Sequence, residues 1–356
     1  MHELVSERIG RAVGEAMAAA DGAIPHRLLR AEVDSWFTAE GLEEILGPAE
    51  TETEAIARAW VARSGKRWRP FLTACTFQAL QTDPAAPVPE SLRRVAVAVE
   101  CFHKASLIHD DIEDEDALRD GQATLHEQYG VPIALNVGDF LLGEGYRLIA
   151  SSGLAADRRA EMLRVAAAGH RTLAIGQGSE LWWAYRPTPL GTEEVLGIFR
   201  RKTAPAFEVA LRFGAIAAGA DDDVWDVLHR YSESLGIAYQ IGDDLKDRNG
   251  LLANEAGGPA QALRPSILLA IAHGRAEGED KRLLEAVWRR TRGAAPHEWR
   301  GLLARLKVEE EARRLLASYE EDALCGLEPL AGARLKNLLR RVLFQIFREV
   351  GPQGVP

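Results

Sequence analysis

Apolar residues recur at spacings of three and four along almost the whole chain, which is the period of an amphipathic α-helix. The pattern is clearest in three stretches, residues 91–110, 193–217 and 335–350. Ala, Leu, Arg and Glu dominate the chain, and all four favour helices. Alternating Val, Ile and Thr residues between Asn-Gly or Asp-Gly turns, which would indicate β-hairpins, are hard to find. We therefore expect an all-α protein.

The segments that interrupt this pattern are short and rich in Pro and Gly. They cover residues 81–90, 185–192, 249–265 and 292–298. None of them is a long low-complexity linker, so we expect one large helical domain over residues 51–350. Residues 1–50 are expected to form an N-terminal helical arm, and residues 351–356 a tail.

Composition and charge narrow the function classes. The chain has 356 residues, of which 47% are hydrophobic and 27% charged, as in an ordinary globular protein. Its net charge of −10 argues against general nucleic-acid binding. Cys75, Cys101 and Cys325 lie far apart among apolar neighbours, so we expect buried reduced thiols. No stretch approaches the length of a membrane span and the first residues lack a signal core, so we expect a soluble, cytoplasmic protein.

The most informative segment is acidic, because six of the seven residues from Asp110 to Asp116 are Asp or Glu. At about 100° per residue, Asp110, Asp111 and Asp114 lie on one face of a single helix. Like charges at this spacing destabilise a helix by roughly 0.2–0.5 kcal/mol per pair, and a bound cation would reverse that effect. By itself the segment fits a solvated helix end as well as it fits a metal site.

The same spacing returns at Asp243, Asp244 and Asp247, again after an apolar helical run. Two such motifs on separate helices can face each other. Carboxylates together with a substrate phosphate are ligands that Mg²⁺ prefers. The pair therefore predicts a magnesium and phosphate site, although either motif alone is weak evidence.

Cations appear at matching points of the sequence. Residues 65–70 (GKRWRP) form a compact basic loop before a helix, Arg119 follows the first acidic motif, and Lys202 lies inside a later helical run. A basic loop is usually a solvated surface. Beside two carboxylate clusters, it favours a second anion pocket.

At this point the chain resembles the trans-isoprenyl diphosphate synthases, also called polyprenyl synthetases. The resemblance runs from about Ile56 to the C-terminus and is closest in character to geranylgeranyl and longer-chain synthases. It rests on seven motifs in the family's order: GKRWRP (65–70), ECFHKASLIHDDIED (100–114), LRDGQATLH (118–126), VGDFLL (137–142), GQGSE (176–180), KTA (202–204) and YQIGDDLKD (239–247). It implies a helical bundle around a central cavity, and a homodimer.

The resemblance also implies the chemistry. An allylic diphosphate, held by about three Mg²⁺, loses diphosphate to give an allylic cation. The double bond of isopentenyl diphosphate attacks that cation and a proton is lost, which lengthens the chain by one isoprene unit. Water would quench the cation, so the pocket must be apolar and closed.

Carried over by position, the resemblance assigns the site residues in three groups. The magnesium ligands are Asp110, Asp111 and Asp114 on one side and Asp243 and Asp247 on the other, with Asp244 binding directly or through water. Arg119 and Lys202 hold the allylic diphosphate, and Gln177, Thr203 and Gln240 line the reacting carbons. Lys66, Arg69 and His103 bind the isopentenyl diphosphate, although His103 could instead be a core histidine.

The chain departs from the family pattern at two places. Asp120 stands where the family usually has a second Arg, which should weaken the isopentenyl diphosphate site unless another residue compensates. Residues 248–263, where the family carries lysines, contain none, and Arg264 is the nearest replacement. A non-catalytic or regulatory subunit of a heteromeric synthase and a class I terpene cyclase therefore stay open as alternatives. Both aspartate motifs are intact, which favours an active enzyme.

Product length should depend on what blocks the apolar tunnel below the first motif. Ser106 and Ala105, four and five residues before Asp110, are small, whereas bulky aromatics there stop growth at the farnesyl stage in this family. Phe102, one turn further, is the first bulky candidate for a floor. Trp182 and Trp183 could close the tunnel from a facing helix or could simply be core. We expect a geranylgeranyl-length product.

Overall fold

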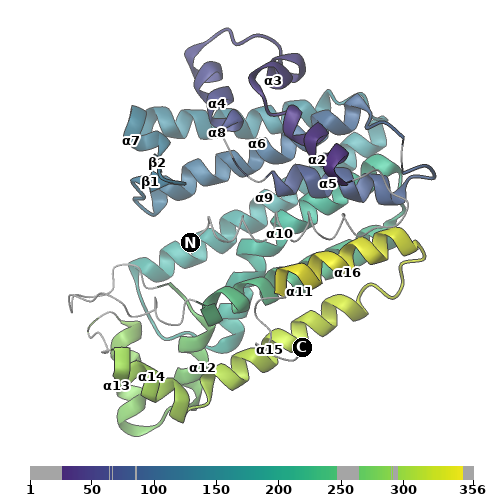
Figure 1. The fold of residues 1–356 in the computed structure, drawn as a ribbon. Coiled ribbons are helices and arrows are strands. Elements are labelled where there is room, and N and C mark those ends of the chain that lie inside the picture. Colours follow the sequence, from purple (N-terminus) through teal and green to yellow (C-terminus); the bar gives the residue numbers. More distant parts are fainter. Residues whose placement is uncertain are drawn as a thin grey trace. The chain divides into compact units, whose positions relative to one another are not determined.

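A computed structural model describes residues 26–63, 65, 67–84, 86–246, 264–289, 291 and 296–347. These residues form helices and one short hairpin, which confirms the all-α prediction (Figure 1). The helices are α2 (His26–Ser35), α3 (Ala39–Leu46), α4 (Glu52–Ala62), α5 (Trp68–Leu80), α6 (Glu90–Glu113), α7 (Leu125–Tyr129), α8 (Val131–Ala150), α9 (Ala156–Tyr185), α10 (Thr192–Ala218), α11 (Asp222–Lys246), α12 (Ile267–Arg275), α13 (Gly278–Trp288), α14 (Pro296–Arg305), α15 (Val308–Cys325) and α16 (Ala333–Phe347).

The helix boundaries follow the sequence pattern closely. The apolar repeats over 91–110 and 193–217 and the described part of the repeat over 335–350 fall in α6, α10 and α16, and the Pro- and Gly-rich breakers at 81–90 and 185–192 separate α5 from α6 and α9 from α10. Within the described residues, no helix is both long enough and apolar enough to cross a bilayer. Cys75 and Cys101 are buried as expected, but Cys325 is exposed at the end of α15, so that part of the cysteine prediction is wrong.

The chain forms two compact units. Unit 1 contains the described residues up to 168 together with 206–229 and 327–346, and unit 2 contains those of 169–205 and 230–326 together with Phe347. The first acidic motif and the basic loop belong to unit 1, and the second acidic motif belongs to unit 2. The chain passes from one unit to the other within α9, α10, α11 and α16. The single domain over 51–350 stays a prediction.

In unit 1, α6 packs along α8, where glycines bring the two helices close together (Figure 1). A Cβ on Gly145 would lie 2.3 Å from the Phe102 ring, and one on Gly138 would lie 2.3 Å from His109. These contacts fix the side of α6 that faces α8. The described part of the N-terminal arm also belongs to unit 1, where Leu29 of α2, Trp36 between α2 and α3, and Leu42 of α3 are buried.

In unit 2, small residues again set the distances between helices. A Cβ on Gly176 of α9 would lie 2.7 Å from the backbone of Arg201 on α10, and one on Gly236 of α11 would lie 2.7 Å from Ala204. The backbones of the three segments therefore approach closely at the GQGSE and KTA motifs. This close approach explains why the polar residues of those motifs can reach one another.

Candidate functional site

The first acidic motif lies where α6 ends. Asp110 and Asp111 occupy its last turn, and Asp114 is the C-cap residue, whose backbone N–H donates to the carbonyls of Asp110 and Ile112. Asp111 is buried, whereas Asp110 and Asp114 are partly exposed. The predicted helix therefore contains Asp110 and Asp111, whereas Asp114 caps its end instead of lying within it.

A two-stranded hairpin, which the sequence analysis did not expect, brings a cation to this helix end. Strands β1 (Leu118–Arg119) and β2 (Gln122–Ala123) pair antiparallel around a turn at Asp120 and Gly121. Both turn residues have positive φ, 52° and 72°, as a two-residue type I′ hairpin requires. The Asp120-Gly121 dipeptide was the sequence signal for this turn. The strands are too short to show the alternation of apolar and polar residues that predicts a hairpin.

The hairpin places Arg119 directly over the acidic motif. Its Nε donates to the Asp111 carboxylate, and its Nη2 lies 3.4 Å from Asp110 Oδ2 and 4.0 Å from Asp116. The Arg119 side chain is 12% exposed and that of Asp111 only 1%. The predicted diphosphate-binding cation and two predicted magnesium ligands thus form one compact group.

Burial disfavours the charged form of the Asp111 carboxyl. Burial, with smaller contributions from Asp110 and Asp116, raises the pKa of Asp111 to about 6, although Arg119 acts in the opposite direction. Its second oxygen, Oδ2, is buried and accepts no hydrogen bond from any described residue. A buried carboxylate oxygen without a donor is what a cation ligand looks like before the cation binds.

These features fit a divalent metal, although no three His, Cys, Asp or Glu side chains within the described residues gather closely enough to enclose an ion by themselves. Mg²⁺ is usually held by one or two carboxylates together with substrate phosphates rather than by a protein cage. Asp110 and Asp111 could supply the one or two carboxylates that such a magnesium site needs.

The basic loop is anchored by a residue that the sequence analysis did not single out. Arg67, with a left-handed φ of 46°, pairs with Glu100 of α6 at 2.6 Å, and both side chains are almost fully buried. Its guanidinium also donates to the carbonyls of Val61 and Arg63. Buried ion pairs position rather than stabilise, so Arg67 fixes the loop on α6. The only sequence signal for this role of Arg67 was its place inside the GKRWRP motif.

The predicted isopentenyl diphosphate residues lie around this anchor. Arg69 stacks on Trp68 with its guanidinium 4.2 Å from the ring centroid, and His103 lies on α6 within one turn of Glu100. Both side chains are partly exposed. Lys66 lies outside the described residues.

The second acidic motif ends α11 in unit 2. Asp243 and Asp244 are partly exposed there, and Asp247 lies outside the described residues. Asp244 Oδ2 accepts hydrogen bonds from Ser266 Oγ at 3.0 Å and from the Ile267 backbone N–H at 2.6 Å. The carboxylate thus stabilises the first turn of α12, a structural task that the sequence did not reveal.

The polar residues of the later motifs also meet in unit 2. Gln240 of α11 donates to the Thr203 hydroxyl of α10 at 2.7 Å, which brings two predicted substrate-lining residues together. Lys202 Nζ lies 3.0 Å from Glu180 of α9, and Arg264 lies 3.6 Å from the same carboxylate. Glu180 belongs to the GQGSE motif, and the sequence predicted no role for it. It holds two cations, one of them the predicted diphosphate ligand Lys202.

Phe102, the predicted tunnel floor, is buried between α6 and α8. Its ring meets Tyr146 edge to face at 5.1 Å, over the backbone of Gly145. Ala105 is buried, whereas Ser106 is exposed and donates to the His103 carbonyl.

The two tryptophans of α9 differ from each other. Trp183 is buried against Trp288, and Trp182 is 62% exposed beside Tyr185. Trp183 therefore belongs to the core of unit 2. Trp182 lies on the surface.

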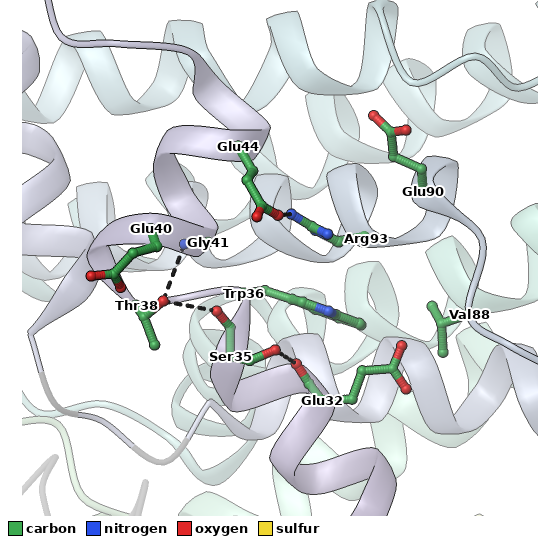
Figure 2. Close-up of a pocket in the computed structure, with 10 residues that line it drawn as sticks. All are labelled: Glu32, Ser35, Trp36, Thr38, Glu40, Gly41, Glu44, Val88, Glu90 and Arg93. Atoms are coloured by element: carbon green, nitrogen blue, oxygen red, sulfur yellow. Dashed lines mark hydrogen bonds and ion pairs between the residues drawn. The ribbon is translucent and has the colours of Figure 1, made fainter.

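A separate pocket of about 480 Å³ lies in unit 1 among α2, α3 and the start of α6 (Figure 2). Arg93 pairs there with Glu44 at 2.5 Å, and burial raises the pKa of Glu32 although Arg93 acts against it. The pocket contains none of the predicted site residues. It is lined by Glu32, Ser35, Trp36, Thr38, Glu40, Gly41, Glu44, Val88, Glu90 and Arg93.

The all-α fold and a helix end that pairs acidic side chains with an arginine define a class of protein suited to an anionic ligand bound with metal. Residues 50–299 match the polyprenyl synthetase family, and the chain belongs to that family. The resemblance inferred from the seven motifs is thereby confirmed.

Curated relatives differ in the product that their names give. The chain is 31% identical over 212 residues to a geranylgeranyl pyrophosphate synthase of Geoglobus acetivorans, a match that covers 59% of this chain and 65% of the relative. It is 28% identical to the octaprenyl diphosphate synthase of Escherichia coli, over 77% of this chain and 87% of the relative. It is 35% identical to a farnesyl diphosphate synthase of Geobacillus stearothermophilus, over 59% of this chain and 70% of the relative.

Solved structures support the fold over most of the chain. The geranylgeranyl pyrophosphate synthetase of Pyrococcus horikoshii matches with a TM-score of 0.73 at 24% identity, over 90% of this chain and 98% of that one. Another match is a geranylgeranyl pyrophosphate synthase of Corynebacterium glutamicum, complexed with isoprenyl diphosphate and magnesium. Its TM-score is 0.68 at 25% identity, over 90% of this chain and 97% of that one.

Proposed function

We propose that this protein is a magnesium-dependent trans-prenyltransferase that condenses isopentenyl diphosphate with an allylic diphosphate, head to tail. The observation that carries the proposal is the group formed by Asp110, Asp111 and Arg119, with its buried, unpaired carboxylate oxygen. Family membership and the relatives' names agree with it.

In this proposal, Asp110, Asp111 and Asp114 bind magnesium from one motif, and Asp243 and Asp247 do so from the other. Magnesium, when bound, stabilises the negative charge on the leaving diphosphate. Arg119 and Lys202 hold the same diphosphate, so their present carboxylate partners would exchange with it. The count of about three ions and the joint action of the two motifs stay predictions. The Corynebacterium relative, complexed with isoprenyl diphosphate and magnesium, supports the choice of metal.

The second substrate is proposed to bind at the basic loop. Lys66, Arg69 and His103 would hold the isopentenyl diphosphate, while Arg67 keeps the loop in place through Glu100. Thr203 and Gln240 hold each other by a hydrogen bond and would face the reacting carbons of the allylic substrate.

We infer a geranylgeranyl-length product, with Phe102 as the floor below the small residues Ala105 and Ser106. The burial of Phe102 against Tyr146 and Gly145 supports a fixed floor. The names of the relatives, which range from farnesyl to octaprenyl synthases, leave the length to experiment.

The protein is also proposed to act as a homodimer in the cytoplasm. Tyr129 at the end of α7 and Val131, Ile133 and Leu135 at the start of α8 are 42–46% exposed, and a group of exposed apolar side chains is what a second copy could cover.

The test is a product assay by mass spectrometry. The purified chain is incubated with Mg²⁺, isopentenyl diphosphate and, separately, dimethylallyl, geranyl or farnesyl diphosphate, with EDTA as the control. We expect elongation that EDTA abolishes, ending at the geranylgeranyl length. No elongation with any primer would refute the proposal and would favour a non-catalytic subunit or a terpene cyclase.

A further inference from the structure

Lys104 is a buried cation on α6 that the proposed function does not use. The residue is 6% exposed, which is rare for lysine unless its ammonium has a partner. It makes no hydrogen bond or ion pair with any residue that the structure describes. Its Nζ lies 3.7 Å from the position that a Cβ on Gly65 would take, directly against the basic loop.

The carboxylates near Lys104 do not neutralise it. Glu100, one turn earlier on α6, already pairs with Arg67 at 2.6 Å. The other acidic neighbour is Asp120 on the exposed hairpin turn, and Arg63 adds a further positive charge. Three cations therefore share two carboxylates in this part of unit 1, although the chain as a whole has a net charge of −10.

The surroundings of Lys104 disfavour its charged form. Burial is the main cause that lowers its pKa; Arg67 and Arg63 lower it further, and Glu100 and Asp120 oppose the change. A desolvated ammonium without sufficient counter-charge is costly to keep in a folded protein. Binding of an anion at this position would remove that cost.

The position of Lys104 indicates which anion would bind next to it. Lys104 follows His103 directly on α6, about 1.5 Å further along the helix axis and about 100° around it. Its ammonium lies next to Gly65, in the loop whose sequence also contains Lys66 and Arg69. Gly65 carries no side chain that would cover the ammonium. Asp120, where the family usually has an arginine, has a positive φ that suits Asp in an Asp-Gly turn.

We propose that Lys104 is a further binding residue for the diphosphate of isopentenyl diphosphate, and that it supplies from α6 the positive charge that Asp120 removes from the hairpin. The proposal rests on the proposed function and adds a residue to that substrate site. It accounts both for the burial of an unpaired lysine and for the tolerance of an acidic residue at position 120.

The test compares KM values of the full chain and of Lys104→Met with Mg²⁺ present. We expect KM for isopentenyl diphosphate to rise about tenfold, equivalent to about 1.4 kcal/mol, because one charge-assisted contact is lost. KM for the allylic diphosphate should stay unchanged. An unchanged KM for isopentenyl diphosphate would overturn the inference while leaving the proposed function in place.

Two variants separate binding from folding. Lys104→Arg keeps the charge and should keep KM near the wild-type value. Lys336→Met removes a partly buried lysine of the same unit, paired with Glu328, and should leave both KM values unchanged. The melting temperature of Lys104→Met should be no lower than that of the wild type, because a poorly paired buried charge is removed. A lower melting temperature with both KM values raised would mean a structural role and would refute the inference.

A third measurement applies if the wild-type chain elongates no primer, which would refute the proposed function itself. Binding of inorganic pyrophosphate is then measured by calorimetry without metal. Weaker binding by Lys104→Met, with binding retained by Lys104→Arg, would still support an anion site at Lys104. Equal binding by all three proteins would overturn it.

Discussion

At position 120, the backbone conformation of the hairpin turn favours Asp, whereas binding of an anionic substrate would favour a positively charged residue. With φ at 52°, Asp120 occupies the first turn position of the β1–β2 hairpin, where Asp and Asn are favoured and a long β-branched or bulky side chain is strained. The hairpin is what carries Arg119 onto Asp110 and Asp111. The chain thus keeps the turn and accepts a negative charge near the proposed isopentenyl diphosphate site.

Asp120→Asn removes this charge and retains the turn, because Asn also tolerates a left-handed backbone. We expect KM for isopentenyl diphosphate to fall a few-fold, with KM for the allylic substrate unchanged, as measured by steady-state kinetics. Asp120→Arg is the less clean variant, because it strains the turn. No change in KM for Asp120→Asn would show that residue 120 does not act on this substrate.

A substitution of Asp110 tests its proposed role as a magnesium ligand. Asp110→Asn should lower turnover by several orders of magnitude, because a magnesium ligand is lost while the side-chain shape is kept. Glu113→Gln, a nearby exposed residue of α6, serves as the matched control and should retain activity. Near-normal turnover of Asp110→Asn would contradict the metal site.

At the scale of elements, α6 carries the parts of the proposed site along a single helix. Phe102, His103 and Lys104 follow one another on one turn, and Asp110 and Asp111 lie about two turns later, at the helix end. Gly138 and Gly145 on α8 fix the rotation of α6, since any side chain there would collide with His109 or Phe102. One helix therefore relates the floor, the cations and the carboxylates.

Shortening Phe102 should deepen the tunnel and lengthen the product. Phe102→Ala leaves a cavity that typically costs about 3–5 kcal/mol, so Phe102→Leu is tested beside it. We expect both variants to give longer chains by mass spectrometry. Phe77→Leu, a buried phenylalanine of α5, should leave product length unchanged. An unchanged product from both Phe102 variants would exclude Phe102 as the floor.

A cluster linking α10 and α11 predicts how stability depends on pH. Burial raises the pKa of Glu208, but its hydrogen bond to His229 and its pairing with Arg212 outweigh this, so its pKa lies below the ordinary 4.5. A lowered carboxyl pKa stabilises the fold above the unfolded-state pKa of about 4.3, and that contribution is lost as the pH falls through the lower folded value.

The melting temperature should therefore fall as the pH is lowered below about 4.3. Glu208→Gln lacks the titrating group, so its melting temperature at neutral pH should be lower and its further loss on acidification smaller. Differential scanning calorimetry of the two proteins across this range is the measurement. Parallel curves would show that Glu208 contributes nothing to the dependence.

At the scale of the whole molecule, the two proposed half-sites belong to different units of the chain. Each unit has its own buried aromatic core, with Trp68 against Phe207 in unit 1 and Trp183 against Trp288 in unit 2. Catalysis in the proposed form needs both acidic motifs on one diphosphate.

The proposed homodimer makes a prediction at this scale. Ile133→Glu combined with Leu135→Glu should convert the protein to a monomer in sedimentation analysis, because charged residues would replace the exposed apolar side chains of α8. Leu324→Glu alters an exposed leucine of α15 and should leave the assembly unchanged. A wild-type monomer would refute the dimer, and a dimeric double variant would exclude these two side chains from the dimer contact.

The sequence by itself determined the helical class, the periodic stretches of α6, α10 and α16, and the motifs that carry the proposed site. Helical periodicity, Pro and Gly breaks and two Asp-Asp-x-x-Asp motifs are local properties, which a linear chain displays directly. Only the tertiary structure decided which groups meet. Arg67 with Glu100, Glu180 with Lys202, Asp244 with the start of α12 and the isolated ammonium of Lys104 are contacts between residues far apart in sequence or results of burial. No local pattern encodes the solvent access and distance on which those electrostatics depend.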